Sequence, residues 1–330
     1  MVIEIINTFE RVLVVSAIPQ DRAGGDPAIR IAYIVLAHGD PLLFGRLMHR
    51  LNHPDAAAFV HLDKKSPLTP FEEQTSSLPN VHLLHNRIHV MWAGFSQCES
   101  TLLTFEAALA GTDERCTHFI VISGADYPLA SNREILDFFA QRPQRQFIRR
   151  FDLMASGDSH QTWRIRGRFF REWADRFTWK RRPLFAIERM LRLFPRRLPQ
   201  GTRFAAGSNW VALTRDCASY CVDKARNDHR LTDFFRPAFG PDEIFLHTLV
   251  ENSPFVDSAS PIEPYVDISK IGGPFAYGNV HALTPKVPIT TAEDAEAILA
   301  SRGEKLFTRK LSSKRSQAAL DVFDRAVLVD

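Results

Sequence analysis

Residues 30–38 read R-I-A-Y-I-V-L-A-H, and this nearly continuous apolar run decides the fold. A strand that is covered by helices on both faces of a parallel sheet has this composition, because neither side of it meets water. The runs A-F-V-H-L-D at 58–63, V-H-L-L-H at 81–85 and H-F-I-V-I-S at 118–123 have the same character. These four segments therefore predict four strands of one buried sheet.

Helices are predicted between the strands. Asp40 and Pro41 suit a helix start, since Pro is favoured in the first turn. The alternation of strand and helix with short turns predicts an α/β fold, a doubly wound and mostly parallel sheet with flanking helices. The predicted helices cover 40–52, 95–110 and 132–141, and a further strand is predicted at 146–150.

Polar residues follow several of the predicted strands. His38, Asp63 and Asp126 all come where a strand ends. Ligands of such sheets bind beyond the carboxyl ends of the strands, so we expect these three side chains to be neighbours in space. No G-x-G-x-x-G follows the first strand and no G-x-x-x-x-G-K-[ST] occurs, which disfavours dinucleotide and S-adenosylmethionine enzymes and excludes a P-loop.

The composition is that of an ordinary soluble globular protein, with 45% hydrophobic and 24% charged residues over a chain of 330. That length accommodates one large α/β domain or two small ones. No apolar run approaches the ~18 residues of a membrane span. Residues 1–28 are weakly patterned and are expected to form an extension outside the fold. The four cysteines (Cys98, Cys116, Cys217 and Cys221) lack metal-ligand or disulfide-framework spacing.

Positive charge is concentrated between Arg142 and Arg203. This segment holds 17 Lys/Arg and 5 Asp/Glu, a local charge of +12, whereas the whole chain carries only +3. Such a block indicates an anionic partner, such as a nucleotide diphosphate, a lipid headgroup, a nucleic acid or an acidic glycan. Within it, 183–195 is a candidate amphipathic helix. Peripheral contact with the inner face of an anionic membrane is one explanation. Another explanation of the positive charge is structural: the arginine side chains extend around a packed helix and keep their charged ends in water. Nucleic acid is not expected, because no recognition motif for it is present.

The stretch 205–256 contains two motifs. G-S-N-W-V-A-L-T-R predicts a short strand at 210–213 and a helix that opens at Thr214. Further on, G-P-D-E-I-F-L-H-T-L-V-E-N-S-P predicts a helix with Asp242 and Glu243 in its first turn, where acids favour the positive end of the helix dipole.

G-S-x-W-x-x-L-T-R followed by P-D-E-x-F-x-x-T-L-x-x-N-S-P resembles the core-2/I-branching enzymes, glycosyltransferase family 14. This family comprises β-1,6-N-acetylglucosaminyltransferases and the peptide O-xylosyltransferases. Four further segments resemble segments of this family and occur in the family's order. They are H-L-D-K-K-S, V-M-W-A-G-F-S-Q, F-I-V-I-S-G-A-D-Y-P-L and L-F-T-R-K-L. The resemblance implies one GT-A-like domain over 29–330, with a nucleotide-sugar-binding half (29–150), a basic insert (151–204) and an acceptor and catalytic half (205–330). Animal members of this family carry several disulfides, so the four cysteines of this chain suggest a bacterial-type member in a reducing cytoplasm.

The resemblance implies a role for individual residues on the donor side. Asp63 and Trp92 would lie against the uridine of a UDP-sugar, with His38 beside them, and Lys310 would contact the diphosphate. Pro264 stands where the family usually has a second cation, for which Lys270 or Arg309 would substitute. Without the resemblance, Asp63 reads equally as a helix cap, Trp92 as a packing aromatic and Lys310 as a solvated lysine.

On the acceptor side, the resemblance makes Glu243 the catalytic base. Ser208 and Trp210 would wall the acceptor site, and Asp242 would cap the helix or orient Glu243. Asp126 would bind sugar hydroxyls, or would simply form a turn.

The expected activity is a single-displacement, inverting transfer of N-acetylglucosamine or xylose from a UDP-sugar to a glycan, lipid-linked or protein acceptor. No D-x-D pair occurs, so lysine and arginine would stabilise the departing diphosphate, and no metal or other cofactor is expected. We expect this transfer reaction to take part in polysaccharide biosynthesis. The alternatives are an inactive sugar- or nucleotide-binding protein and a protein that binds anionic surfaces.

Overall fold

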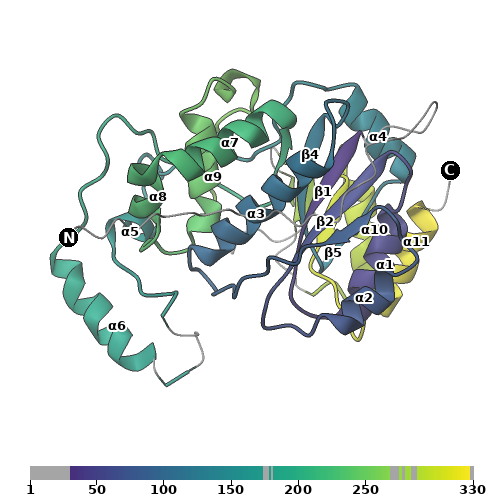
Figure 1. The fold of residues 1–330 in the computed structure, drawn as a ribbon, viewed down its shortest axis with the longest axis horizontal. Coiled ribbons are helices and arrows are strands. Elements are labelled where there is room, and N and C mark those ends of the chain that lie inside the picture. The colour runs from purple at the N-terminus through teal and green to yellow at the C-terminus, as the bar shows by residue number, and fades with distance from the viewer. Residues whose placement is uncertain are drawn as a thin grey trace, which may run out of the picture.

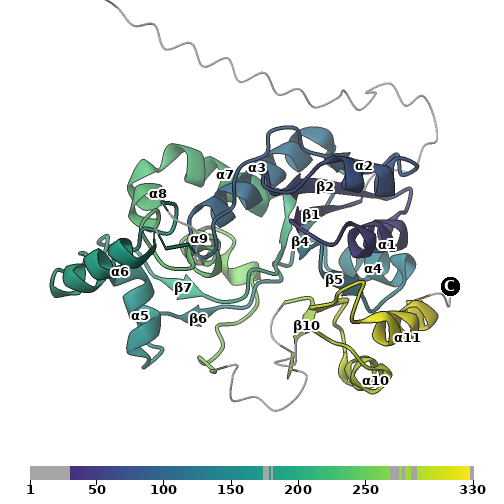
Figure 2. The same ribbon diagram turned by 90° about the horizontal axis from the view of Figure 1, so that it is seen from below.

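The predicted α/β fold is confirmed. A computed structural model describes residues 30–173, 178–179, 181–267, 275–276, 279–283 and 288–327. Its central sheet has the strand order β3-β2-β1-β4-β8 and carries helices on both faces (Figure 1, Figure 2). The first four strands in this order run parallel, and β8 joins the edge antiparallel to β4. The strands are β1 (Ile31–Ala37), β2 (Ala56–Leu62), β3 (Val81–Leu83), β4 (His118–Ser123) and β8 (Ala212–Thr214).

The sheet is buried on both faces, as the apolar run at 30–38 predicts. Ile31, Tyr33 and Val35 pack into one hydrophobic cluster, and the alternate residues Ala32 and Ile34 pack into a second cluster on the opposite face. The first cluster is covered by α1 (Pro41–Leu51), α2 (Thr69–Thr75), α4 (Asn132–Ala140), α10 (Ala292–Ser301) and α11 (Gln317–Val327). The second is covered by α3 (Ser96–Gly111), α7 (Arg215–Asn227), α8 (His229–Phe235) and α9 (Phe245–Glu251).

A second, smaller sheet joins the carboxyl end of the first. Strand β5 (Asp126–Pro128) follows β4 after a two-residue turn and pairs antiparallel with β11 (Phe307–Arg309). Its register sets Arg309 opposite Asp126. The C-terminal part of the chain is thereby fixed at the edge where the parallel strands end. The remaining strands of this sheet are β10 (His281–Leu283) and β9 (Phe275–Ala276).

The stretch 205–256 differs from the prediction in one respect. The strand and the following helix form as expected, with Thr214 accepting a hydrogen bond from the Cys217 amide as the N-cap of α7. Asp242 and Glu243, however, do not open a long helix. They lie in a separate 3-10 turn, η2 (Pro241–Glu243), because Ile244 has φ −130° and interrupts the helix before α9 begins.

Residues 146–150 do not form the predicted regular strand. Gln146, Phe147 and Arg150 make only isolated bridges, with Ala259, Ala212 and Ile262 respectively. The adjacent residues pair instead as a two-stranded ribbon of β6 (Phe151–Asp152) and β7 (Ala205–Ala206).

The basic insert forms α5 (Ser159–Arg166) and α6 (Arg181–Met190), and a 3-10 turn, η1 (Leu191–Leu193), extends α6. The predicted amphipathic helix at 183–195 is thus present, two residues earlier at its start. In both views α6 projects away from the sheet (Figure 1, Figure 2). None of the helices in the described ranges has both the length and the apolar character of a membrane span. Residues 1–28, expected to form an extension, lie outside the described residues, and the predicted division of 29–330 stays a prediction.

Candidate active site

Glu243 presents its carboxylate at the surface, with the side chain 48% exposed. Its Oε2 accepts a hydrogen bond from Arg164 Nη2 at 2.7 Å. The buried guanidinium of Arg164 is itself held by the carbonyls of Phe239, at 3.1 Å, and Gly240, at 2.7 Å. Among the described residues no hydrogen bond reaches the second oxygen, Oε1. One oxygen of Glu243 is therefore fixed and the other is open to a ligand.

Gly240 shapes the turn that carries Glu243. Its φ of +56° lies in the left-handed region, and a Cβ at this position would approach Arg164 Nη2 to 2.8 Å. Glycine accepts that backbone conformation without a steric cost. It also leaves the space that the guanidinium of Arg164 occupies.

Asp242 points to the other side of the same turn. Its Oδ2 accepts hydrogen bonds from Gln97 Nε2 at 3.1 Å and Asn209 Nδ2 at 2.5 Å. Burial raises the pKa of Asp242 to about 6, and the neighbouring charge of Glu243 adds to this effect. Asp242 does not cap α9, because Ile244 takes that position and makes no side-chain cap. Asp242 instead ties the turn of Glu243 to α3 and to Asn209.

Asp63 follows β2 and is buried. Its Oδ1 accepts hydrogen bonds from the amides of Lys65, at 3.0 Å, and Val90, at 3.4 Å. Lys65 Nζ donates to the carbonyl of Val90 at 2.7 Å. Asp63 is therefore not a helix cap. It fixes a turn and clamps the loop that precedes α3.

That loop carries Trp92, whose side chain is 50% exposed. The Trp92 ring meets Phe239 edge-on, with 5.6 Å between centroids. The next residue, Ala93, accepts a hydrogen bond from the Gly240 amide at 3.0 Å. The loop held by Asp63 is thus joined directly to the turn that carries Glu243.

His38, after β1, stands close to the C-terminal cations. Burial lowers the pKa of His38, and the positive charge of Lys310 adds to this lowering, while Asp63 opposes it. The exposed Lys310 is held in place by its neighbour Leu311, whose amide donates to the carbonyl of Ala125 at 2.9 Å. His38 is therefore within electrostatic range of both Asp63 and Lys310, which lie far from it in the sequence.

Asp126 is completely buried and is surrounded by donors. It accepts hydrogen bonds from the Ser123 amide at 2.9 Å, from Arg309 Nε at 3.2 Å and from His281 Nε2, also at 3.2 Å. Burial alone would raise the pKa of Asp126, but the His281 hydrogen bond and the charge of Arg309 outweigh it and lower the pKa. Because protein groups enclose this carboxylate, it positions Arg309 and does not offer the direct sugar contact that we predicted.

Arg309 and Trp210 face one another. The guanidinium carbon lies 4.1 Å from the centroid of the Trp210 ring, a cation–π distance. On the preceding turn, Ser208 Oγ accepts a hydrogen bond from the Trp210 amide at 3.4 Å, and Ser208 is nearly buried. Trp210 is half-buried, so part of its ring remains open to a ligand.

These contacts close into a ring around the carboxyl ends of β1, β2 and β4, the place that the sequence predicts. Lys270 lies outside the described residues. The sequence patterns did not identify several residues that position the side chains of this ring. Of these, Asn209 lies within a quoted motif and Arg164 within the basic insert. The ring is closed by three kinds of link. Hydrogen bonds join Gly240 to Ala93, Val90 to Asp63 and Asn209 to Asp242. Charge links His38 to Asp63 and Lys310, the cation–π contact joins Arg309 to Trp210, and the remaining steps are between neighbours in the chain.

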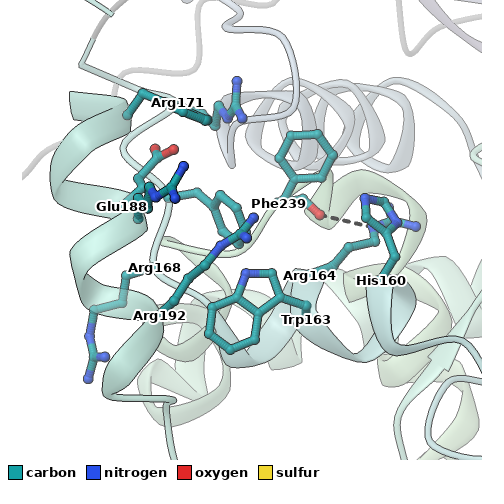
Figure 3. A pocket seen from close by; sticks show the side chains of 11 residues that line it. His160, Trp163, Arg164, Arg168, Arg171, Glu188, Arg192 and Phe239 are labelled. Atoms are coloured by element: carbon teal, nitrogen blue, oxygen red, sulfur yellow. Dashed lines mark hydrogen bonds between the residues drawn. The ribbon is translucent and has the colours of Figure 1, made fainter. Parts of the chain in front are cut away.

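A cavity of 220 Å³ adjoins the ring and is bounded by α5, α6 and Phe239 (Figure 3). Arg164 lines it and also holds Glu243, so cavity and carboxylate share one cation. Five arginines line the cavity against one acid, Glu188, and Glu188 is paired with the buried Arg181. In Figure 3, Arg192 lies beside the Trp163 ring, and the side chain of Glu188 points inward from α6. The lining is therefore basic and aromatic.

In the described part of the chain, no three His, Cys, Asp or Glu side chains are grouped so that they could hold a metal ion. The predicted independence from metal stays a prediction.

The fold and the ring define an α/β protein with an exposed carboxylate and fixed cations at the carboxyl ends of its strands. A family model described as Core-2/I-Branching enzyme matches residues 31–261. The chain therefore belongs to the core-2/I-branching enzyme family, as the two motifs predict, and this membership supports the GT-A-like description of the fold.

Individual relatives are more distant. Xylosyltransferase 1 of Mus musculus is 28% identical over 236 residues, which cover 70% of this chain and 23% of that protein. Xylosyltransferase 2 of Rattus norvegicus is 28% identical over 237 residues, which cover 70% and 26%. The chain thus spans about a quarter of the length of the curated relatives it matches. The crystal structure of mouse xyloside xylosyltransferase 1 in its apo form gives a TM-score of 0.34 at 9% identity, over 71% of this chain and 85% of that one. A structural similarity this weak supports no conclusion about the fold or the function of this chain.

Gly207 provides a test of the backbone geometry around Glu243. Its amide donates to the Glu243 carbonyl at 2.9 Å, and a Cβ there would lie 1.9 Å from the Arg149 carbonyl oxygen. We expect Gly207→Ala to lower the free energy of unfolding by about 2 kcal/mol through overpacking. Gly39→Ala is the matched control, because nothing lies within 4 Å of its Cβ. Chemical denaturation of both variants measures the difference, and equal stability would contradict the close approach.

Asp242→Asn tests the raised pKa. Because burial penalises the ionised carboxylate, the native protein loses stability as the pH rises from the ordinary range of aspartate through about 6. Asparagine keeps an oxygen for Gln97 and Asn209 but carries no charge. We therefore expect the variant to match the unsubstituted protein in Tm near pH 4 and to exceed it at pH 8. A lower Tm for the variant at pH 8 would show that the carboxylate is stabilising when ionised.

Proposed function

We propose that this chain is an inverting, metal-independent glycosyltransferase that moves N-acetylglucosamine or xylose from a UDP-sugar to an acceptor hydroxyl. The observation that carries the proposal is the ring. It joins the turn that carries the open carboxylate oxygen of Glu243 to the exposed Lys310 and to Arg309, through hydrogen bonds, charge and neighbours in the chain. Inverting transfer requires a base on one side of the anomeric carbon and compensation for charge on the leaving group on the other.

In the proposed reaction, Glu243 Oε1 takes the proton of the acceptor hydroxyl. The acceptor oxygen forms a bond to the anomeric carbon while the bond from that carbon to the diphosphate breaks. UDP departs with the electron pair of that bond, and Lys310 and Arg309 stabilise the charge that develops on its phosphates. Arg164 fixes Oε2, so that the reacting oxygen keeps one orientation.

Donor recognition is proposed to involve the residues around Asp63. A half-exposed Trp92 offers a ring face to a uracil base, and His38, at its lowered pKa, presents a neutral imidazole near the phosphates. The buried, clamped Asp63 supports the loop that carries Trp92.

The acceptor is proposed to carry negative charge. The cavity beside Glu243 is lined by five arginines, and its one acid, Glu188, is already neutralised by Arg181. A phosphate or carboxylate of a glycan, a lipid-linked sugar or a protein would be attracted by the positive charge of this lining. Trp163 and Phe169 line the same cavity and offer apolar surface to a sugar ring.

The compartment proposed for the reaction is the cytoplasm. The four cysteines are buried free thiols, which fits a reducing compartment.

Glu243→Gln tests the base. We expect kcat to fall by about 10²–10⁴, because the amide cannot accept the proton, while UDP affinity stays within about twofold. UDP release in single-turnover and steady-state assays measures the rate, and calorimetry measures the binding. Turnover at the original rate would remove Glu243 from its role. Loss of both turnover and UDP binding would indicate a disrupted site.

Metal chelation tests the leaving-group chemistry. Activity is expected to persist in excess EDTA, whereas Lys310→Ala is expected to lower kcat by about 10²–10³. Loss of activity in EDTA with recovery on adding Mn²⁺ would contradict the role of the side-chain cations. Selective UDP-sugar binding with neither hydrolysis nor transfer would favour the inactive binding protein.

A further inference from the structure

The exposed apolar side chains of this protein are concentrated on one segment. Of the twelve large apolar side chains that are exposed in the described residues, seven lie between 173 and 194. Surface apolar residues that occur singly need no explanation, but a contiguous group marks a binding surface. The seven are Trp173, Trp179, Phe185, Ile187, Met190, Leu193 and Phe194.

The orientation of α6 is the reverse of that of a helix packed on its own core. The residues that α6 buries are Arg181 and Glu188, which form an ion pair with each other. Its apolar residues Ile187 and Met190 are exposed, and Leu193 in the following turn is 77% exposed. A helix that serves only the interior of a globular protein turns its apolar residues inward. The apolar side of α6 therefore suits a partner outside the fold, and Figure 2 shows the helix projecting from the body.

Positive charge surrounds these apolar side chains. Arg182, Arg189, Arg192 and Arg197 are all exposed. The single acid between 181 and 203 is Glu188, which is buried. The α6 surface, defined as the exposed apolar and arginine side chains of 182–197, thus combines apolar groups with uncompensated positive charge.

We propose that the α6 surface binds the interface of an anionic lipid bilayer. Apolar side chains enter the boundary between headgroups and acyl chains, and the arginines pair with lipid phosphates, a combination that binds amphipathic helices to anionic membranes. A second copy of this chain fits less well, because a twofold contact would set these arginines against their own copies. A nucleic acid would match the arginines but would leave Met190 and Leu193 without partners.

The position of this surface agrees with the site. Arg189 and Arg192 of the same segment also line the cavity that shares Arg164 with Glu243. A bilayer bound at the α6 surface would therefore hold the cavity near the lipid headgroups. This last step rests on the proposed function and points to lipid-linked acceptors, whereas membrane binding itself does not depend on the reaction.

Vesicle flotation with the full chain tests the proposal. We expect binding to vesicles of phosphatidylcholine with about 40 mol% phosphatidylglycerol, and weak binding to phosphatidylcholine alone. The triple variant Met190→Ser/Leu193→Ser/Phe194→Ser should bind the anionic vesicles about tenfold more weakly, because the buried apolar area is lost. The double variant Arg182→Gln/Arg197→Gln should bind the anionic vesicles more weakly at low salt and reduce the difference between the two vesicle types, since Arg189 and Arg192 remain.

Matched controls separate these effects from general damage. Leu42→Ser removes an apolar side chain that is 63% exposed on α1, and Arg133→Gln removes an exposed arginine on α4. Neither should change vesicle binding, and UDP binding and Tm should be retained in all four variants. Equal binding of the triple variant and the unsubstituted protein would overturn the proposal. So would a dimer in solution that dissociates in the triple variant while no vesicles are bound.

Discussion

The contact between Asp126 and Arg309 is the interaction on which the candidate site depends. A fully buried carboxylate is costly unless donors surround it, and Asp126 has the Ser123 amide, His281 and Arg309 as donors. Because β5 and β11 pair at this point, the contact fixes the C-terminal strand against the end of β4. It also sets Arg309 over Trp210 and brings Lys310 within electrostatic range of His38. The cations of the site are therefore held by a group that does not itself face the ligand.

Much of the fold could be predicted because its strands are buried on both faces. The run at 31–37 has no polar residue, and such a pattern has few explanations other than a central parallel strand. The rule that ligands bind at the carboxyl ends of parallel strands then predicts that His38 and Asp63 lie together, and the charge of Asp63 does act on His38. The motif around Glu243 identified the family, and the match over 31–261 confirms that assignment.

The other features of the fold and of the candidate site depend on contacts between segments that are distant in the sequence, and no local sequence pattern predicts such contacts. Arg164 is one arginine among many in a basic segment, and only the tertiary fold brings it to Glu243. The helix start predicted at Asp242 is interrupted at Ile244. The 3-10 turn there is held by its contacts with Gln97, Asn209 and Gly207, as well as by its own hydrogen bond from the Ile244 amide to the Pro241 carbonyl. The strand predicted at 146–150 makes single bridges to two separate segments, around Ala212 and at 259–262, so its apolar residues are buried without a regular ladder. Asp126 has the sequence context of a turn, and its burial follows from the distant strand β11.

Arg164 couples the turn of Glu243 to the arginine-rich cavity. One guanidinium both holds Glu243 Oε2 and lines that cavity. Its donors are already divided between Glu243 and the carbonyls of Phe239 and Gly240. An anion in the cavity would compete with Glu243 Oε2 for the same guanidinium. Occupation of the cavity would thus loosen the hold on one carboxylate oxygen, so that the orientation of Glu243 would depend on what the cavity contains.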